Sequence, residues 1–279
     1  MALWGAVAVL SLTAACGDSA DDEAAGPTST SATSAAPSPT ADVGEYCATA
    51  LEIETVPEPD IDFESASEEE IAAAVKQQAQ EVYLPLAEDV EASAPDEIAA
   101  DVDTLVAAVE ELATTGDFET TFESPEVVAA EERVHAFDLA NCGWEQVDVT
   151  AVDYAFQGIA GSYPAGPVSF ELTNQGGELH EFVLLQKNEG VTESFEAILA
   201  GGEEEGGQKV TPLGGTFAAP GEDGYKVANL EPGEYAVVCF IPVGSTPEAE
   251  AAAEGSGEAP EGPPHFTQGM SSVFTVEQG

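Results

Sequence analysis

Positive charge is what this sequence has least of. Only 5 of its 279 residues are Lys or Arg, against 54 Asp and Glu, and the formal net charge is −49. Nucleic acids and anionic membrane surfaces repel such a chain, so we expect no nucleic-acid partner and no basic membrane-binding patch. The acidity has two explanations. Acidic residues spread along the whole sequence favour solvation in a salty environment, and attraction of a cationic partner is the alternative.

The sequence begins with an apolar run that is too short to span a bilayer as a mature helix. This run, MALWGAVAVLSLTAAC, ends in small residues, which predicts an export signal peptide over residues 1–15. Its end, LTAAC, resembles the lipobox of bacterial lipoproteins. That resemblance implies cleavage before Cys16 and attachment of lipid to Cys16, whereas in an ordinary secretory signal Cys16 would be incidental.

Residues 16–42 contain almost nothing that a folded core would bury. The stretch GDSADDEAAGPTSTSATSAAPSPTAD is rich in Ser, Thr, Ala and Pro, which predicts a flexible tether. A lipid anchor followed by a tether holds a folded body off a membrane. We therefore expect an extracytoplasmic protein, anchored by lipid to the cell membrane at the cell surface or in the periplasm.

The next part of the chain has helical periodicity. Ser67 and Glu70 have the spacing of a capping box, and they precede an apolar-periodic run that reaches Pro85. A second helix is expected to start near Pro95. Its apolar residues recur at spacings of three and four, and Gly116 is in a position to end it.

A third helix completes a predicted helical domain over residues 43–145. Ser124 is its expected N-cap, Pro125 its first residue, and the NCG at residues 141–143 its end. His135 lies in this helix with no second His or Cys nearby, so we interpret it as structural or surface-exposed and not as a metal ligand. The domain resembles disulfide-closed helical regions that precede other domains in actinobacterial lipoproteins, a likeness that implies no activity.

Four cysteines allow three pairings into two disulfides. In an exported protein, Cys47 and Cys142, which flank the helical part, are better explained as a disulfide than as free thiols. With Cys16 assigned to lipid and Cys239 to the chemistry described below, only this pair remains. Such a disulfide would close a loop of 95 residues. In the chain-entropy model it contributes about 4 kcal/mol.

From residue 146 to 279 the pattern changes to short β-rich runs separated by Gly, Pro and Asn turns, which predicts a β-sandwich. Apolar and polar residues alternate as a half-buried strand requires. Within this domain, residues 194–201 predict a short helix, 201–207 an acidic loop, and 244–264 an acidic insertion without regular structure. The expected strands are VDVTAVDYAF, GPVSFELTN, HEFVLLQ, GEYAVVCFIP and SSVFTVE.

Rare residues gather at the ends of these runs. His180 follows the turn NQGGEL, Cys239 ends the strand EYAVVC, and His265 and Met270 precede the last strand. Two imidazoles, a thiolate and a thioether are the ligands of a blue-copper site, in which His2Cys is trigonal and Met is a long axial ligand. The alternative is a metal-free module in which His180 caps a strand, Cys239 is a small buried residue and Met270 fills the core.

At these residues the sequence resembles the cupredoxins, the family of plastocyanin and azurin. FELTNQGGELHEF resembles the strand, turn and first His of that family, LEPGEYAVVC its Cys-bearing strand, and HFTQGMSSVFTV its His-x4-Met end and final strand. The resemblance implies a Greek-key β-sandwich, a type 1 copper cofactor, and a solvent-facing His265 through which the electron leaves. The loop from Cys to His is short in the family and has 25 residues here. The metal ligands carried over are His180, Cys239, His265 and Met270.

A copper ion saturated by protein ligands offers no position to a substrate, so the ligand set predicts single-electron transfer and not an enzyme. Three histidines are also too few for the trinuclear cluster of a multicopper oxidase or the second copper of a nitrite reductase. The expected partner is an unidentified redox protein, cationic if the acidic surface serves docking. The alternatives are a copper carrier and a metal-free cupredoxin-like binding module.

Overall fold

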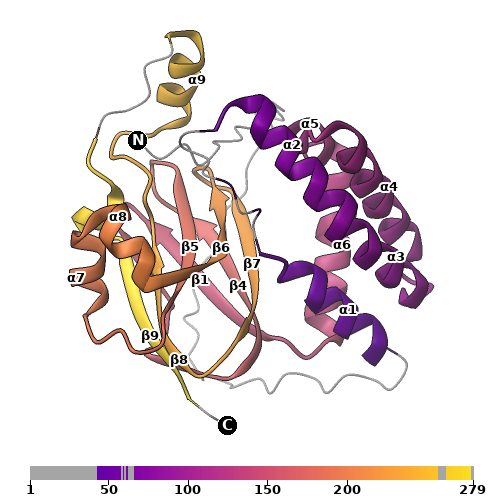
Figure 1. Ribbon diagram of the computed structural model, residues 1–279, viewed down its shortest axis with the longest axis horizontal. Helices are drawn as coiled ribbons and strands as arrows, with labels where there is room; N and C mark the ends of the chain where they lie inside the picture. Colours follow the sequence, from indigo (N-terminus) through magenta and orange to yellow (C-terminus); the bar gives the residue numbers. More distant parts are fainter. Residues whose placement is uncertain (1–42, 58, 60, 62–65, 257–261, 278–279) are drawn as a thin grey trace, which may run out of the picture.

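The computed structural model describes residues 43–57, 59, 61, 66–256 and 262–277. The predicted signal peptide, the predicted lipidation site Cys16 and the predicted tether lie outside these described residues. Within them, no helix is long and apolar enough to cross a membrane. An N-terminal helical layer is followed by a sandwich of two β-sheets, as the sequence predicts (Figure 1).

The helical layer forms around the caps that the sequence contains. Ser67 accepts a hydrogen bond from the backbone of Glu70 and its own backbone donates to the Glu70 carboxylate, which confirms the capping box. Gly116 ends its helix in the left-handed conformation, and the Ser124 hydroxyl caps the last helix. The helices are α1 (Gly44–Glu54), α2 (Glu68–Gln78), α3 (Leu84–Ser93), α4 (Ala99–Thr115), α5 (Phe118–Phe122) and α6 (Pro125–Asn141).

The sequence suggests that the first periodic run stops at Pro85, but in the structure the helix continues through this residue. A π-helical segment, Ala79–Tyr83, joins α2 directly to α3. Proline is tolerated in the first turn of a helix, where a backbone N–H has no partner within the helix, and Pro85 occupies such a position in α3. The chain therefore keeps its helical direction through Pro85.

The sandwich consists of a four-stranded sheet ordered β2-β1-β4-β7 and a five-stranded sheet ordered β3-β9-β8-β5-β6. Strands β1 and β4 are parallel, as are β3 and β9, whereas the other neighbours are antiparallel. The core between the sheets is aromatic and aliphatic, with Phe170, Phe182 and Phe274 fully buried. The strands are β1 (Glu145–Val152), β2 (Ala155–Gln157), β3 (Ser162–Pro164), β4 (Gly166–Asn174), β5 (His180–Lys187), β6 (Val210–Ala218), β7 (Asp223–Leu230), β8 (Gly233–Val238) and β9 (Ser271–Glu277).

Two acidic segments that were expected to be loops are helical. The predicted helix at residues 194–201 is present as α7 (Phe195–Ala200), and the chain then forms α8 (Gly202–Gly206). The insertion contains α9 (Pro247–Ser256), which Figure 1 shows projecting from one end of the sandwich. Ala and Glu are strong helix formers, and the Thr246 hydroxyl caps the first turn of α9, so the composition that suggested a loop suits a helix.

The helical layer packs on the outer face of the sheet that contains β4 and β7. Val227 of β7 belongs to the hydrophobic cluster formed by α1, α3, α4 and α6. His135 of α6 is buried, stacks on Tyr225 with ring centroids 3.5 Å apart, and places Nε2 3.1 Å from the Glu171 carboxylate. His135 therefore joins helices to sheet, in agreement with its structural interpretation.

The structure confirms the disulfide between Cys47 in α1 and Cys142 at the end of α6.

We expect the Cys47→Ala/Cys142→Ala double variant to lose about 4 kcal/mol of unfolding free energy, because the disulfide closes a loop of 95 residues and restricts the unfolded chain. Urea unfolding measures the loss. Wild-type protein unfolded under reducing conditions is the control and should match the variant. A loss below about 1 kcal/mol would show that the bond does not constrain the unfolded state as this model requires.

Candidate metal centre

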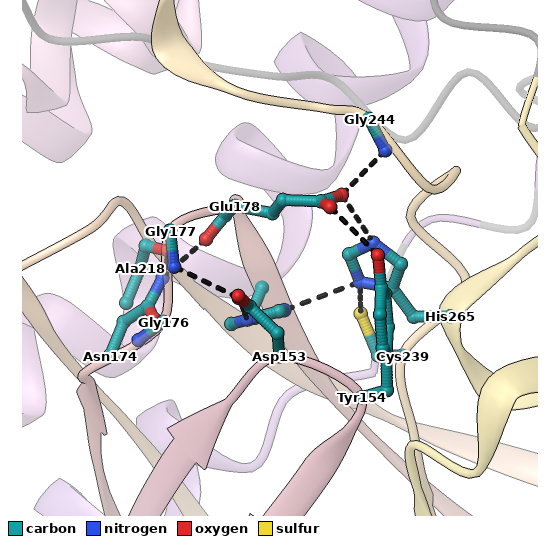
Figure 2. A network of polar contacts seen from close by, with 11 residues as sticks. Asp153, Tyr154, Asn174, Gly176, Gly177, Glu178, Ala218, Cys239, Gly244 and His265 are labelled. Carbon is teal, nitrogen blue, oxygen red and sulfur yellow. Dashed lines mark hydrogen bonds and ion pairs between the residues drawn. The ribbon is translucent and has the colours of Figure 1, made fainter.

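Three of the four ligands expected from the sequence lie together at one end of the sandwich. His180 is the first residue of β5, Cys239 directly follows β8, and His265 begins a short 3-10 helix, His265–Gln268. All three side chains are fully buried, and their ligand atoms lie within 4.8 Å of one another. Figure 2 shows Cys239 and His265 with Glu178 above them and Asp153 to their left.

Strand pairing explains why residues so distant in sequence meet. Strands β5 and β8 are antiparallel neighbours with Val183 opposite Val238, which brings His180 and Cys239 to the same end of the sheet. Strand β9 lies on the other side of β8. The backbone of His265 returns to this end by donating a hydrogen bond to the Ile241 carbonyl at 2.8 Å.

Met270 also lies beside Cys239. The Cys239 backbone N–H donates to the Met270 carbonyl at 3.2 Å, and the Met270 backbone N–H donates to the His265 carbonyl at 3.2 Å. Its side chain is fully buried in the same hydrophobic cluster as Cys239. The fourth expected ligand is thus adjacent to Cys239 and His265 in the fold.

The distances between ligand atoms suit a metal ion. The Nδ1 atoms of His180 and His265 are 3.2 Å apart, and the Cys239 sulfur is 3.4 Å from His265 Nδ1. An ion bonded at about 2.0 Å to nitrogen and about 2.3 Å to sulfur separates its ligands by about 3.3 Å and about 3.5 Å at tetrahedral angles. The protein therefore holds these atoms at the spacing that a shared ion requires.

Carboxylates contact the opposite nitrogen of each imidazole. His265 Nε2 lies 3.0 Å from Glu178 Oε2, and His180 Nε2 lies 3.4 Å from Asp153 Oδ1. A carboxylate at Nε2 favours the tautomer that keeps its proton there, which leaves the Nδ1 lone pair free. Burial, followed by the nearby His265, lowers the pKa of His180 and so favours its neutral, ligating form. Two lone pairs then face each other, an arrangement that a cation between them stabilises.

The surroundings of the Cys239 thiol decide whether it is protonated. The backbone N–H groups of Glu181 and Ile241 hydrogen-bond to the sulfur. Burial, reinforced by the Glu181 carboxylate, nevertheless raises the pKa of Cys239 to about 12. The thiol is therefore protonated in the absence of a cation, and only a bound positive charge would stabilise the thiolate in this buried position.

The polar layer over the site is itself fixed by hydrogen bonds. Glu178 accepts from the Tyr154 hydroxyl at 2.9 Å and from the backbone of Gly244, and Asp153 accepts from the backbone of Gly177 at 2.9 Å. The buried Asn174 amide donates to the Glu178 and Ala218 carbonyls at 2.9 and 2.8 Å, which closes the loop before His180.

Gly176 allows this layer to approach the metal centre. A Cβ at this position would lie 2.4 Å from Asp153 Oδ1 and 2.6 Å from His180 Nε2. Both distances are far below van der Waals contact. Only glycine therefore permits the contact between His180 and Asp153.

The expectation that His265 faces solvent is wrong. His265 is fully buried, because Glu178 lies over its Nε2 and the Tyr154 ring packs edge-on at 5.2 Å. The Gly244 backbone, in the segment after Cys239, holds Glu178 in this position. Glu178 stands two residues before His180 in the sequence, and this proximity could have indicated a carboxylate near the site. No sequence pattern indicated Asp153 or Tyr154.

Comparisons with known proteins find a likeness in solved structures alone. No family model matches the chain, and no curated protein matches it. An auracyanin from Roseiflexus castenholzii is 16% identical over 47% of this chain and 96% of its own, with a TM-score of 0.30. Auracyanin B is 20% identical over 48% and 88%, with a TM-score of 0.29. Auracyanin A from Chloroflexus aurantiacus, described as a "blue" copper protein, is 15% identical over 48% and 100%, with a TM-score of 0.27.

The fold class predicted from the sequence, disulfide-closed helices followed by a cupredoxin-like sandwich, matches the structure. The TM-scores of the solved structures are too low to carry an argument about function. What this chain does is therefore inferred from its own residues. The buried cluster of His180, Cys239 and His265 is a candidate metal centre in a cupredoxin-like domain.

Proposed function

We propose that the protein is an electron-transfer protein that binds copper through His180, Cys239 and His265 in a type 1 site, with Met270 as the axial ligand. The observation that carries the proposal is the spacing of the ligand atoms. Two imidazole Nδ1 atoms and a thiol sulfur converge at 3.2 and 3.4 Å in a site without solvent exposure. These atoms are those that a blue-copper site uses.

The ligand chemistry favours copper over other metals. Thiolate and thioether are soft ligands that suit copper, and imidazole binds copper as well. Zinc accepts the same Cys and His ligands, but structural zinc sites have four Cys or His ligands and catalytic ones keep an open position for water. Here Met270 lies beside three buried ligands, and the described residues supply no fourth His or Cys to the cluster.

Burial of the whole cluster favours electron transfer over catalysis. All three ligands are fully buried, so no described surface leads a substrate to the ion. An electron needs no such opening, because copper changes its charge by one without exchanging ligands. A site closed by Glu178 and Tyr154 also argues against a carrier that must release its copper readily.

The acidic layer over His265 is the proposed docking surface for the redox partner. Asp153 is 47% exposed and Glu178 15% exposed, and both carboxylates contact ligand imidazoles. Because His265 is buried, Glu178 and Asp153 form a partly exposed layer over the ligand imidazoles. A cationic partner protein would be attracted to it by long-range electrostatics that salt screens.

The lipid anchor at Cys16 and the extracytoplasmic location remain proposals supported by the N-terminal sequence. The disulfide between Cys47 and Cys142 fits this location, because such bonds persist in oxidising compartments. The anchor would keep the copper domain at the membrane surface.

Electrochemistry tests the proposed function. The copper-loaded protein should give one reversible one-electron wave, because buried ligands change little between the two oxidation states of copper. Cys239→Ser should lose this wave, since it removes the thiolate. Cyclic voltammetry of both proteins measures the result. Wild-type protein that holds copper without exchanging electrons reversibly would contradict the proposal and favour a carrier.

Glu178→Gln tests the role of the carboxylate on His265. A carboxylate at Nε2 makes the imidazole a better donor, which stabilises the more positive Cu(II) state. We expect the variant to raise the reduction potential by about 60 mV, equivalent to a tenfold relative loss of Cu(II) affinity.

Two further variants are compared with Glu178→Gln in the same measurement of the reduction potential. Met270→Leu should also raise the potential, because it removes the axial thioether but keeps the three strong ligands. Glu248→Gln removes an exposed carboxylate of α9 and is the matched control, with an expected shift below about 10 mV. Equal shifts in Glu178→Gln and Glu248→Gln would show that Glu178 acts as surface charge alone.

A further inference from the structure

A second feature of the molecule lies away from the metal centre, in the helical layer. A cavity of about 490 Å³ opens between the helices and the adjoining β6 and β7 strands. One wall is apolar and comes from α4, with Val102, Leu105, Val106 and Val109 as lining residues. Cavities of this size hold small molecules in other proteins.

The cavity is also lined by polar and acidic residues. Glu54, Glu131 and Asp138 line it together with Tyr46 and Lys226, so three carboxyl groups face one ammonium group. Burial is the main cause that raises the pKa of Glu54 and of Asp138 to about 7. Buried carboxylates are costly unless a positive charge or hydrogen-bond donors compensate them.

Hydrogen bonds satisfy these carboxyl groups in part. The Tyr46 hydroxyl donates to Asp138 Oδ1 at 2.8 Å, and the Tyr225 hydroxyl donates to Glu131 Oε1 at 3.0 Å. Asp138 is only 2% exposed, so its carboxyl group has little contact with bulk water. A buried carboxyl group at the wall of a cavity can accept a further hydrogen bond from a ligand.

We propose that this cavity binds an amphipathic cation, a primary amine with an apolar tail. The ammonium group would lie among the carboxyl groups of Glu54, Glu131 and Asp138 and donate hydrogen bonds to them. The tail would extend along the apolar wall of α4. An anionic amphiphile such as a fatty acid is disfavoured, because three acidic groups outweigh Lys226.

Titration calorimetry with octylammonium tests the proposal on the copper-free protein. Octylammonium should bind with one-to-one stoichiometry. Octanoate, which has the same tail length and the opposite charge, should bind at least about tenfold more weakly, as should ethylammonium, which lacks the tail. Equal binding of octylammonium and octanoate would overturn the charge assignment. Equal binding of octylammonium and ethylammonium would overturn the role of the apolar wall.

Variants separate the cavity from the acidic surface, which attracts any cation. Val106→Trp fills the cavity but keeps every charge, so it should abolish one-to-one binding of octylammonium. Asp138→Asn should weaken the binding by about tenfold, and Glu54→Gln provides a second test if that variant does not fold. Glu248→Gln, on exposed α9, should leave the affinity unchanged. Retention of binding in folded Val106→Trp protein would place the ligand elsewhere and refute the proposal.

Discussion

Two imidazole nitrogens and a cysteine sulfur meet in a fully buried space, and the rest of the domain is organised around this contact. The Nδ1 atoms of His180 and His265 lie 3.2 Å apart, where neutral imidazoles with their protons on Nε2 repel each other. A metal ion turns that repulsion into coordination. The outer carboxylates of Asp153 and Glu178 strengthen the effect, because they hold the protons away from the ligand atoms.

This arrangement also explains the closure of the site. Glu178 joins three segments, since it contacts His265, the Tyr154 hydroxyl and the Gly244 backbone. Figure 2 shows these contacts above Cys239. A carboxylate that orients a ligand therefore also excludes solvent from it. In the proposed electron-transfer function, an electron would therefore leave through this acidic layer and not through an exposed imidazole.

Local sequence signals predicted what depends on short-range chemistry. The capping box at Ser67 and the glycine end at Gly116 were found in this way, whereas the disulfide between Cys47 and Cys142 was inferred because Cys16 and Cys239 were assigned other roles. The candidate ligands were recognisable because His and Met are rare in the chain. Strands β6 and β7 were missed, because Pro, Gly and Lys interrupt their alternation. The carboxylate of Asp153 was also missed, since strand pairing alone brings that turn to the site, and the acidic helix α9 was mistaken for a loop.

The central claim is that these residues form a blue-copper site, and the visible and electron paramagnetic resonance spectra of the Cu(II)-loaded protein test it most directly. Thiolate bonding from Cys239 should produce an intense visible charge-transfer band and a small copper hyperfine splitting, with one copper bound per chain. A weak visible band with the large hyperfine splitting of a tetragonal site would contradict the account. So would a failure to bind Cu(II), which would leave a metal-free cupredoxin-like module.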